Sequence, residues 1–224
     1  MNQFIDPRLE EAYSHVLEGD LQDAVDIFEK YLKEEPENTH LLMELASIYY
    51  IQSEMTKCIE TYEKVLSIKP DSLFVLYRLG VAYYRFTHFS PAVEMFKRVI
   101  ASGKAMPMTY IWLGLSYYHM GQEENSIATY RKLLELCPET TIADYYMGVS
   151  LKSSGKYEEA LPHFEKLLEE NSLHVSARYH LGRVYMKMYN YEKAKEQFKL
   201  VLDIDPLNKN ASEMYDYIND DHSF

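Results

Sequence analysis

The chain repeats one pattern of small and large residues every 34 positions, and this period constrains its fold more than any other feature. Steps of 34 from Gly114 reach small residues, at Ala12, Ala46, Gly80, Gly148 and Gly182. Steps from Ser126 also reach small residues, at Ala24, Cys58, Ala92, Ala160 and Ala194. Steps from Tyr130 reach aromatic residues, at Phe28, Tyr62, Phe96, Phe164 and Phe198. Self-similarity of this length is typical of stacked helical hairpins.

Each repeat is predicted to hold two short amphipathic helices joined by a turn. Ser126 and Tyr130 are four residues apart and therefore share one helix face. A small residue on each helix lets the backbones approach closely, and Pro138 ends the second helix because proline lacks the backbone donor. Six repeats fit without insertion, at residues 5–38, 39–72, 73–106, 107–140, 141–174 and 175–208. The turns are expected near Gly19, Ser53, Thr87, Gly121, Gly155 and Tyr189.

One more helix is expected after Pro206. Ala211, Met214, Tyr215 and Ile218 recur at helical spacing. Residues 209–219 are therefore predicted to form a capping helix over the exposed side of the sixth repeat, and residues 220–224 a disordered tail.

From about Ile5 to Asn208 these repeats resemble the tetratricopeptide repeat (TPR) family. The family's first-helix motif residues are present at Leu45, Leu79, Leu113, Leu181, Tyr49, Tyr83, Tyr117 and Tyr185. Repeat five departs from the motif with Met147 and Leu151, and repeat one with Glu11 and His15. The resemblance implies an all-α fold, a right-handed α-solenoid of six hairpins plus the capping helix. It also implies that the first helices line a concave groove that binds a segment of another protein.

Composition argues against several classes of function. A net charge of −12 on 224 residues disfavours nucleic acid as the main partner, because phosphates are repelled overall. Apolar runs such as residues 74–79 are interrupted by Arg78, so no membrane insertion is expected. Because the first residues form neither a basic nor an apolar leader segment, a cytoplasmic location is expected.

Motifs for catalysis are missing from the sequence. It contains no Gly-rich phosphate loop, no His-Glu-x-x-His and no nucleophile elbow. Cys58 occupies the small position of its repeat and is expected to fill the core. We therefore expect a chain that is not an enzyme and that carries no cofactor or metal.

The candidate binding residues are the groove positions of the first helices in repeats three to six. These positions include five Lys or Arg and no Asp or Glu, whereas repeats one and two place Asp6, Glu10 and Glu44 there. The predicted groove residues are Phe74, Tyr77, Arg78, Tyr84, Arg85, Met108, Ile111, Trp112, Leu115, Tyr118, His119, Tyr145, Tyr146, Val149, Lys152, Tyr179, Arg183 and Lys187.

A wall of aromatic residues flanked by cations suits an acidic protein segment, extended or helical, that carries aromatic or aliphatic anchors. Two alternatives stay open. Tyr77, Tyr145 and Tyr179 can instead pack on the next repeat. The chain can also self-assemble into homo-oligomers, with the terminal segments 4–6 and 220–224 of one copy in the groove of the next. The Lys and Asn residues of the family's carboxylate clamp are absent from the first-helix positions, so a chaperone tail is not the expected ligand.

Overall fold

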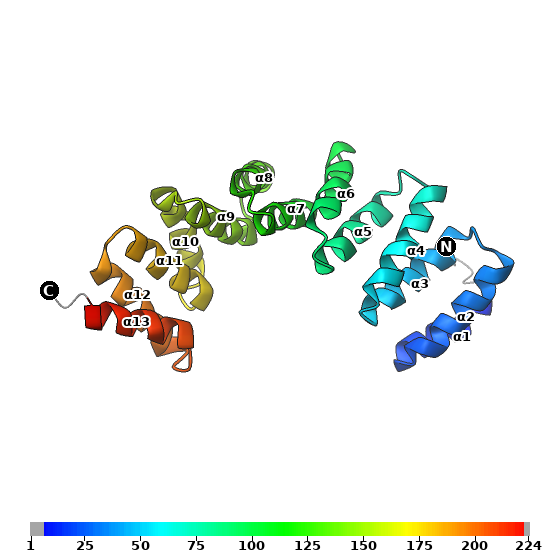
Figure 1. Cartoon of the computed structure of the whole chain (residues 1–224), viewed down its shortest axis with the longest axis horizontal. Helices are drawn as coiled ribbons and strands as arrows, with labels where there is room; N and C mark the ends of the chain where they lie inside the picture. The colour runs from blue at the N-terminus through cyan, green and yellow to red at the C-terminus, as the bar shows by residue number, and fades with distance from the viewer. Residues whose placement is uncertain (1–6, 222–224) are drawn as a thin grey trace. The chain divides into compact units, whose positions relative to one another are not determined.

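The protein is described by a computed structural model that covers residues 7–221 (Figure 1). This range is all helical, with no strand, which confirms the predicted all-α repeat fold. The helices are α1 (Pro7–Glu18), α2 (Leu21–Glu34), α3 (Thr39–Ile51), α4 (Met55–Ile68), α5 (Leu73–Arg85), α6 (Phe89–Ala101), α7 (Pro107–His119), α8 (Glu123–Leu136), α9 (Thr141–Ser153), α10 (Tyr157–Glu170), α11 (Val175–Lys187), α12 (Tyr191–Ile204) and α13 (Lys209–Asp221).

The turn inside each hairpin uses one left-handed residue. Positive φ angles occur at the six predicted turn positions, Gly19, Ser53, Thr87, Gly121, Gly155 and Tyr189. Glycine adopts this conformation without steric cost, whereas Ser53, Thr87 and Tyr189 bring a Cβ into it. The turn geometry therefore belongs to the repeat as a whole and persists where the sequence does not supply a glycine.

The small and large residues of the repeat meet between the two helices of a hairpin. A Cβ added to Gly114 of α7 would lie only 2.4 Å from the ring of Tyr130 on α8, so the ring occupies the space of the missing side chain. Phe164 and Tyr130 are both fully buried at this contact in their repeats. Cys58 is also buried, as predicted, and burial raises the pKa of its thiol to about 11.

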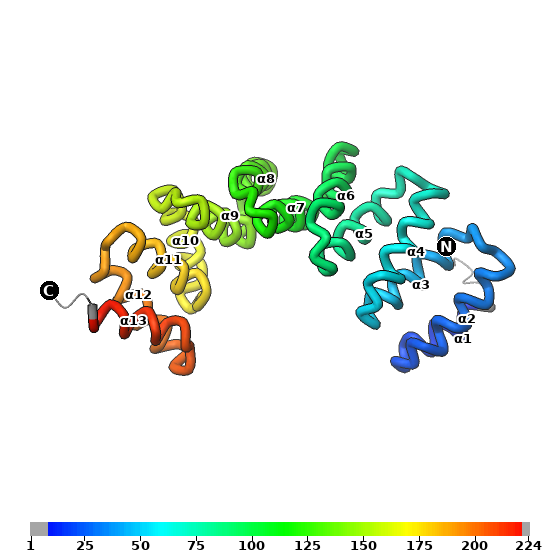
Figure 2. The backbone as a smooth tube through the Cα atoms, viewed as in Figure 1, coloured from blue at the N-terminus to red at the C-terminus, as the bar shows by residue number. Residues whose placement is uncertain are grey.

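The chain divides into two compact units, Met1–Trp112 (unit 1) and Leu113–Phe224 (unit 2). Within each unit the backbone runs back and forth through successive helices (Figure 2). Neighbouring hairpins are joined by a repeated hydrogen bond from a first-helix tyrosine to a glutamate of the preceding helix. Tyr49 donates to Glu29 at 2.7 Å in unit 1, and Tyr185 donates to Glu165 at 3.3 Å in unit 2. These tyrosines are structural, which separates them from the candidate binding residues.

Helix α13 packs on α12 at the end of unit 2. Its residues Ala211 and Ile218 are buried, as expected of a helix that covers the last repeat. The helix runs to Asp221, so the prediction that residues 220 and 221 belong to a disordered tail is wrong. Residues 222–224 and residues 4–6, including Asp6, lie outside the described part of the chain.

A candidate peptide-binding face

Side chains of consecutive first helices contact one another directly, and the predicted groove residues lie along these contacts. We call the two sets the first-helix faces. The first-helix face of unit 1 consists of Phe74, Tyr77, Arg78, Tyr84, Arg85, Met108 and Trp112. The first-helix face of unit 2 consists of Leu115, Tyr118, His119, Tyr145, Tyr146, Val149, Lys152, Tyr179, Arg183 and Lys187. All of these side chains are exposed or partly exposed, with Phe74 the most open apolar one at 58%.

Ile111 is a correction to the predicted set. Its residue is only 1% exposed, so it belongs to the core and presents no surface to a ligand. Its neighbour Trp112 on the same helix remains partly exposed. Helical spacing alone placed Ile111 at the edge of the predicted face, where the side chain turns inward.

In unit 1 the aromatic residues form a hydrogen-bonded cluster. The indole Nε1 of Trp112 donates to the hydroxyl of Tyr77 at 3.2 Å. The Trp112 ring also lies against Tyr84, with 5.0 Å between ring centroids. The Tyr77 ring packs edge-on against Phe96, which anchors it to the second helix of its own repeat. The cluster joins α5 to α7 and presents a rigid, partly exposed aromatic surface.

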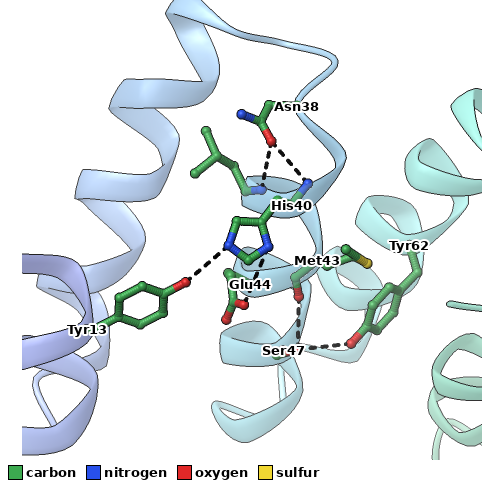
Figure 3. Close-up of polar contacts among 8 residues, drawn as sticks. Tyr13, Asn38, His40, Met43, Glu44, Ser47 and Tyr62 are labelled. Atoms are coloured by element: carbon green, nitrogen blue, oxygen red, sulfur yellow. Dashed lines mark hydrogen bonds and ion pairs between the residues drawn. The ribbon is translucent and has the colours of Figure 1, made fainter. Parts of the chain in front are cut away.

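The two arginines on the first-helix face of unit 1 share an aromatic partner that was not among the predicted groove residues. The guanidinium groups of Arg78 and Arg85 lie 5.3 and 4.9 Å from the ring centroid of Tyr50 on α3. Arg78 Nε also donates to the hydroxyl of Tyr62 at 3.3 Å, and that hydroxyl lies 3.1 Å from Ser47 Oγ (Figure 3). A shift of 34 residues from Tyr84 leads to Tyr50, so the period itself was the signal that could have found it.

The face changes character toward the N-terminus of unit 1. His40 lies between Tyr13 and Glu44, with its Nε2 3.4 Å from the Tyr13 hydroxyl and its Nδ1 3.9 Å from Glu44 (Figure 3). Burial raises the pKa of Tyr13, and the charge of Glu44 adds to this effect. Glu44 is therefore the acidic residue near Tyr13 and His40, and the acidic character expected of the first two repeats stays a prediction.

Unit 2 brings two cations and a partly buried histidine together. Lys152 Nζ on α9 lies 3.2 Å from Nδ1 of His180 on α11, and Arg183 Nη1 donates to the hydroxyl of Tyr179 at 3.1 Å. Burial lowers the pKa of His180 to about 3, with further contributions from Lys152, Arg183 and His174. Burial and the charge of Arg183 also lower the pKa of Lys152. His180 is therefore neutral near pH 7 and accepts a hydrogen bond from the ammonium of Lys152.

Tyr145 packs against the following repeat. Its ring stacks on His174, with 5.7 Å between centroids, and lies 5.8 Å from His180. Tyr179 instead packs against Phe198 of its own repeat, at 5.7 Å. Both rings retain partial exposure. Tyr145 and Tyr179 therefore pack against neighbouring rings and still present part of their surface to solvent.

A pocket of about 350 Å³ lies at the end of unit 2. It is formed where α11 meets the start of α12 and the capping helix α13. Its lining contains no Asp or Glu and consists of Arg183, Met186, Lys187, Tyr189, Tyr191, Met214 and Tyr217. Arg183 and Lys187 are among the predicted groove residues, whereas Met214 and Tyr217 are not, because α13 was predicted only as a capping helix.

Family models described as tetratricopeptide repeat match most of the chain. One covers residues 15–71 and 151–214, a second covers 109–140 and a third covers 74–102. The chain belongs to the tetratricopeptide repeat family. None of the curated proteins compared with it matches.

Solved structures of other TPR proteins share the fold. The chain is 24% identical to YrrB, titled a TPR protein with an unusual peptide-binding site, with a TM-score of 0.71 over 83% of this chain and 96% of that one. It is 26% identical to MamA, with a TM-score of 0.68 over 75% and 96%. PilW, a type IV pilus biogenesis factor, is 19% identical, with a TM-score of 0.75 over 95% and 99%.

Two further properties bear on what the TPR array can bind. Among residues 7–221, no helix combines the length and apolar character needed to cross a bilayer. One group of potential metal ligands, His15, Glu18 and Asp20, occurs in the same range. Glu18 and Asp20 are exposed, and nothing else in unit 1 marks this group as a metal site.

Proposed function

We propose that this TPR protein is a non-enzymatic adaptor whose first-helix faces bind a segment of a partner protein. The segment is acidic and carries aromatic or aliphatic anchors. The anchors contact exposed rings such as Phe74 and Trp112, and the carboxylates of the segment face the cations of α5, α9 and α11.

The observation that carries this proposal is the charge of the faces. The protein has a net charge of −12, yet the first-helix faces of α5 to α11 present five cations and no carboxylate. A protein surface with random charge placement would show the opposite sign here. Charge complementarity of this kind raises association rates and sets orientation, while rigid aromatic groups supply most of the binding energy.

The test compares two triple variants, each of which replaces two cations and one apolar residue by serine and so changes the net charge equally. The first, Phe74→Ser with Arg85→Ser and Lys187→Ser, changes exposed residues of the first-helix faces. The control, Lys64→Ser with Leu136→Ser and Lys199→Ser, changes one exposed apolar residue and two exposed cations on second helices. Because all six side chains are exposed, circular dichroism should show both variants folded.

Each variant is immobilised beside the wild-type protein, and the proteins captured from a cell lysate are identified by mass spectrometry. We expect the control to retain the wild-type partners and the face variant to lose them. Equal recovery of the same partners by both variants would show that the first-helix faces are not the binding surface.

A further inference from the structure

Unit 2 leaves two cations without an anionic partner in a partly buried place. Burial lowers the pKa of Lys152, and the positive charge of Arg183 lowers it further. Among the described residues, no carboxylate lies within ion-pair distance of either cation. The groups that face His180 are Lys152, Arg183 and His174, together with the rings of Tyr145, Phe164 and Tyr179, so no negative charge acts on it either.

The same unit does pair its other buried charge. Asp144 on α9 is 3% exposed, and Lys166 donates to its Oδ2 at 2.6 Å while His163 Nδ1 lies 2.8 Å from its Oδ1. Desolvating a charge costs free energy unless an opposite charge or hydrogen bonds compensate for it. Lys152 and Arg183 therefore differ from Asp144 in having no opposite charge beside them.

One of these two cations, Arg183, lines the pocket at the end of unit 2. Lys187 lines it as well, and the rest of the lining is apolar or aromatic, including Met186, Met214 and Tyr217. An anion held by Arg183 would thus have an apolar cavity of about 350 Å³ next to it.

We propose that Lys152 and Arg183 form a carboxylate subsite, and that the pocket closed by α13 takes an apolar side chain next to that carboxylate in an acidic peptide. The inference rests on the proposed function and specifies which residues of the first-helix face of unit 2 bind a carboxylate of the ligand. It assigns the capping helix a role in binding as well as in covering the last repeat. The ligand side chain fits between the two methionines, whose flexible thioethers adapt to different shapes.

The probe is a pair of blocked pentapeptides, acetyl-Glu-Phe-Asp-Leu-Glu-amide and the isostere in which Gln and Asn replace the acidic residues. Binding to the full-length protein is followed by NMR of methyl-labelled methionine, which reports on Met186 and Met214 directly. We expect the acidic peptide to shift both methyl signals and the isostere to bind about tenfold more weakly, the usual loss for one charge-assisted hydrogen bond.

Three variants connect this result to the named residues. Arg183→Met and Lys152→Met should each remove the preference for the acidic peptide. Arg183→Lys, which keeps the positive charge, should retain this preference. The control Lys199→Met should bind both peptides like the wild-type protein. The dispersion of the methyl spectrum shows that each variant is folded.

Equal binding of both peptides at these methyl groups would overturn the carboxylate subsite and leave the adaptor function standing. Failure of both peptides to shift Met186 or Met214 would also overturn it. In that case the capture experiment with the face variants still decides the proposed function independently.

Discussion

The two units build the same contact with its chemical groups exchanged. In unit 1, the ring of Tyr50 on one first helix meets the cation of Arg78 on the next. Three repeats later, the same positions hold Lys152 and His180, so the cation is now on the earlier helix and the ring on the later one.

The two units also differ at the position that Arg183 occupies in unit 2. The position of Arg183 in unit 2 corresponds to Val81 in unit 1, which is buried at 7% exposure. In unit 1, the guanidinium groups of Arg78 and Arg85 both pack on the ring of Tyr50. In unit 2, Arg183 lies over the ring of Tyr179, with 5.9 Å between its guanidinium and the ring centroid, but no carboxylate of the described residues lies within ion-pair distance of it. Equivalent positions of the repeat thus place two cations on one aromatic ring in unit 1, and a lysine beside a histidine in unit 2, where we propose the carboxylate subsite.

The largest expected effect concerns the acid stability of unit 2. His180 has a pKa of about 3 in the folded state, below its ordinary value of 6.5, so the unfolded state binds more protons as the pH falls. Between pH 7 and pH 5 this should cost unit 2 about 2 kcal/mol of stability. In His180→Gln the loss should disappear, as measured by native-state hydrogen exchange of α11 amides.

The exposed His119 supplies the control for this prediction. His119→Gln should keep the pH dependence of the wild-type protein, because its residue is open to solvent. If His180→Gln loses as much protection between pH 7 and pH 5 as the wild-type protein does, the partly buried neutral histidine is not the cause.

The second prediction tests whether the unit 1 cation is structural. Arg78→Met removes a cation–π contact with Tyr50 and leaves the Tyr62 hydroxyl without one donor. We expect a loss of about 1–2 kcal/mol in unit 1. Hydrogen exchange of α5 amides measures it, and an unchanged exchange rate in α5 would show that the contact with Tyr50 carries no stability.

The sequence was sufficient to predict the fold because the repeat leaves little freedom. A small residue opposite a large aromatic one, as at Gly114 and Tyr130, fixes the approach of the two helices in each hairpin. The turn positions follow from the same period, even at Tyr189, where no glycine marks them. The 34-residue repeat did not predict the division of the chain into two units inside α7, between Trp112 and Leu113.

The candidate site was predicted less completely, because its character depends on contacts between repeats. Helical spacing identified Arg78, Lys152 and Arg183 as one class of residue. It did not show that Arg78 packs on the ring of Tyr50 of the preceding first helix, whereas Arg183 packs on Tyr179 of its own helix. Ile111 was misplaced for a related reason, since the edge of a helix face is set by what packs beside it.

The third prediction is that Lys152, unlike Arg78, contributes little to stability. Lys152→Met removes a half-buried charge along with a hydrogen bond to His180, so the two effects should cancel to within about 0.5 kcal/mol at pH 7. The same hydrogen-exchange measurement on α9 amides tests this. A loss as large as that of Arg78→Met would make the two cations equally structural.

The difference between Lys152→Met and the wild-type protein should also depend on pH. The lysine pKa is lowered by folding, so the charge opposes folding below that lowered pKa, and this penalty fades as the pH rises toward 10.5. The wild-type protein should therefore gain stability relative to Lys152→Met in that window. A constant difference across it would mean that the charge is not desolvated.

The smallest expected effect isolates the second cation. Arg183→Val copies the unit 1 arrangement, where Val81 stands at this position. The pKa of Lys152 should rise, because one partly screened like charge is removed. It should stay below 10.5, because burial is the larger cause of its depression and is not removed. A titration of the Lys152 side chain by NMR measures the shift, with Lys187→Met as a control that removes an exposed cation from the same helix. A Lys152 pKa that is the same in Arg183→Val and wild type would place Arg183 too far away to share an anion with it. The two units would then differ only in which helix carries the ring.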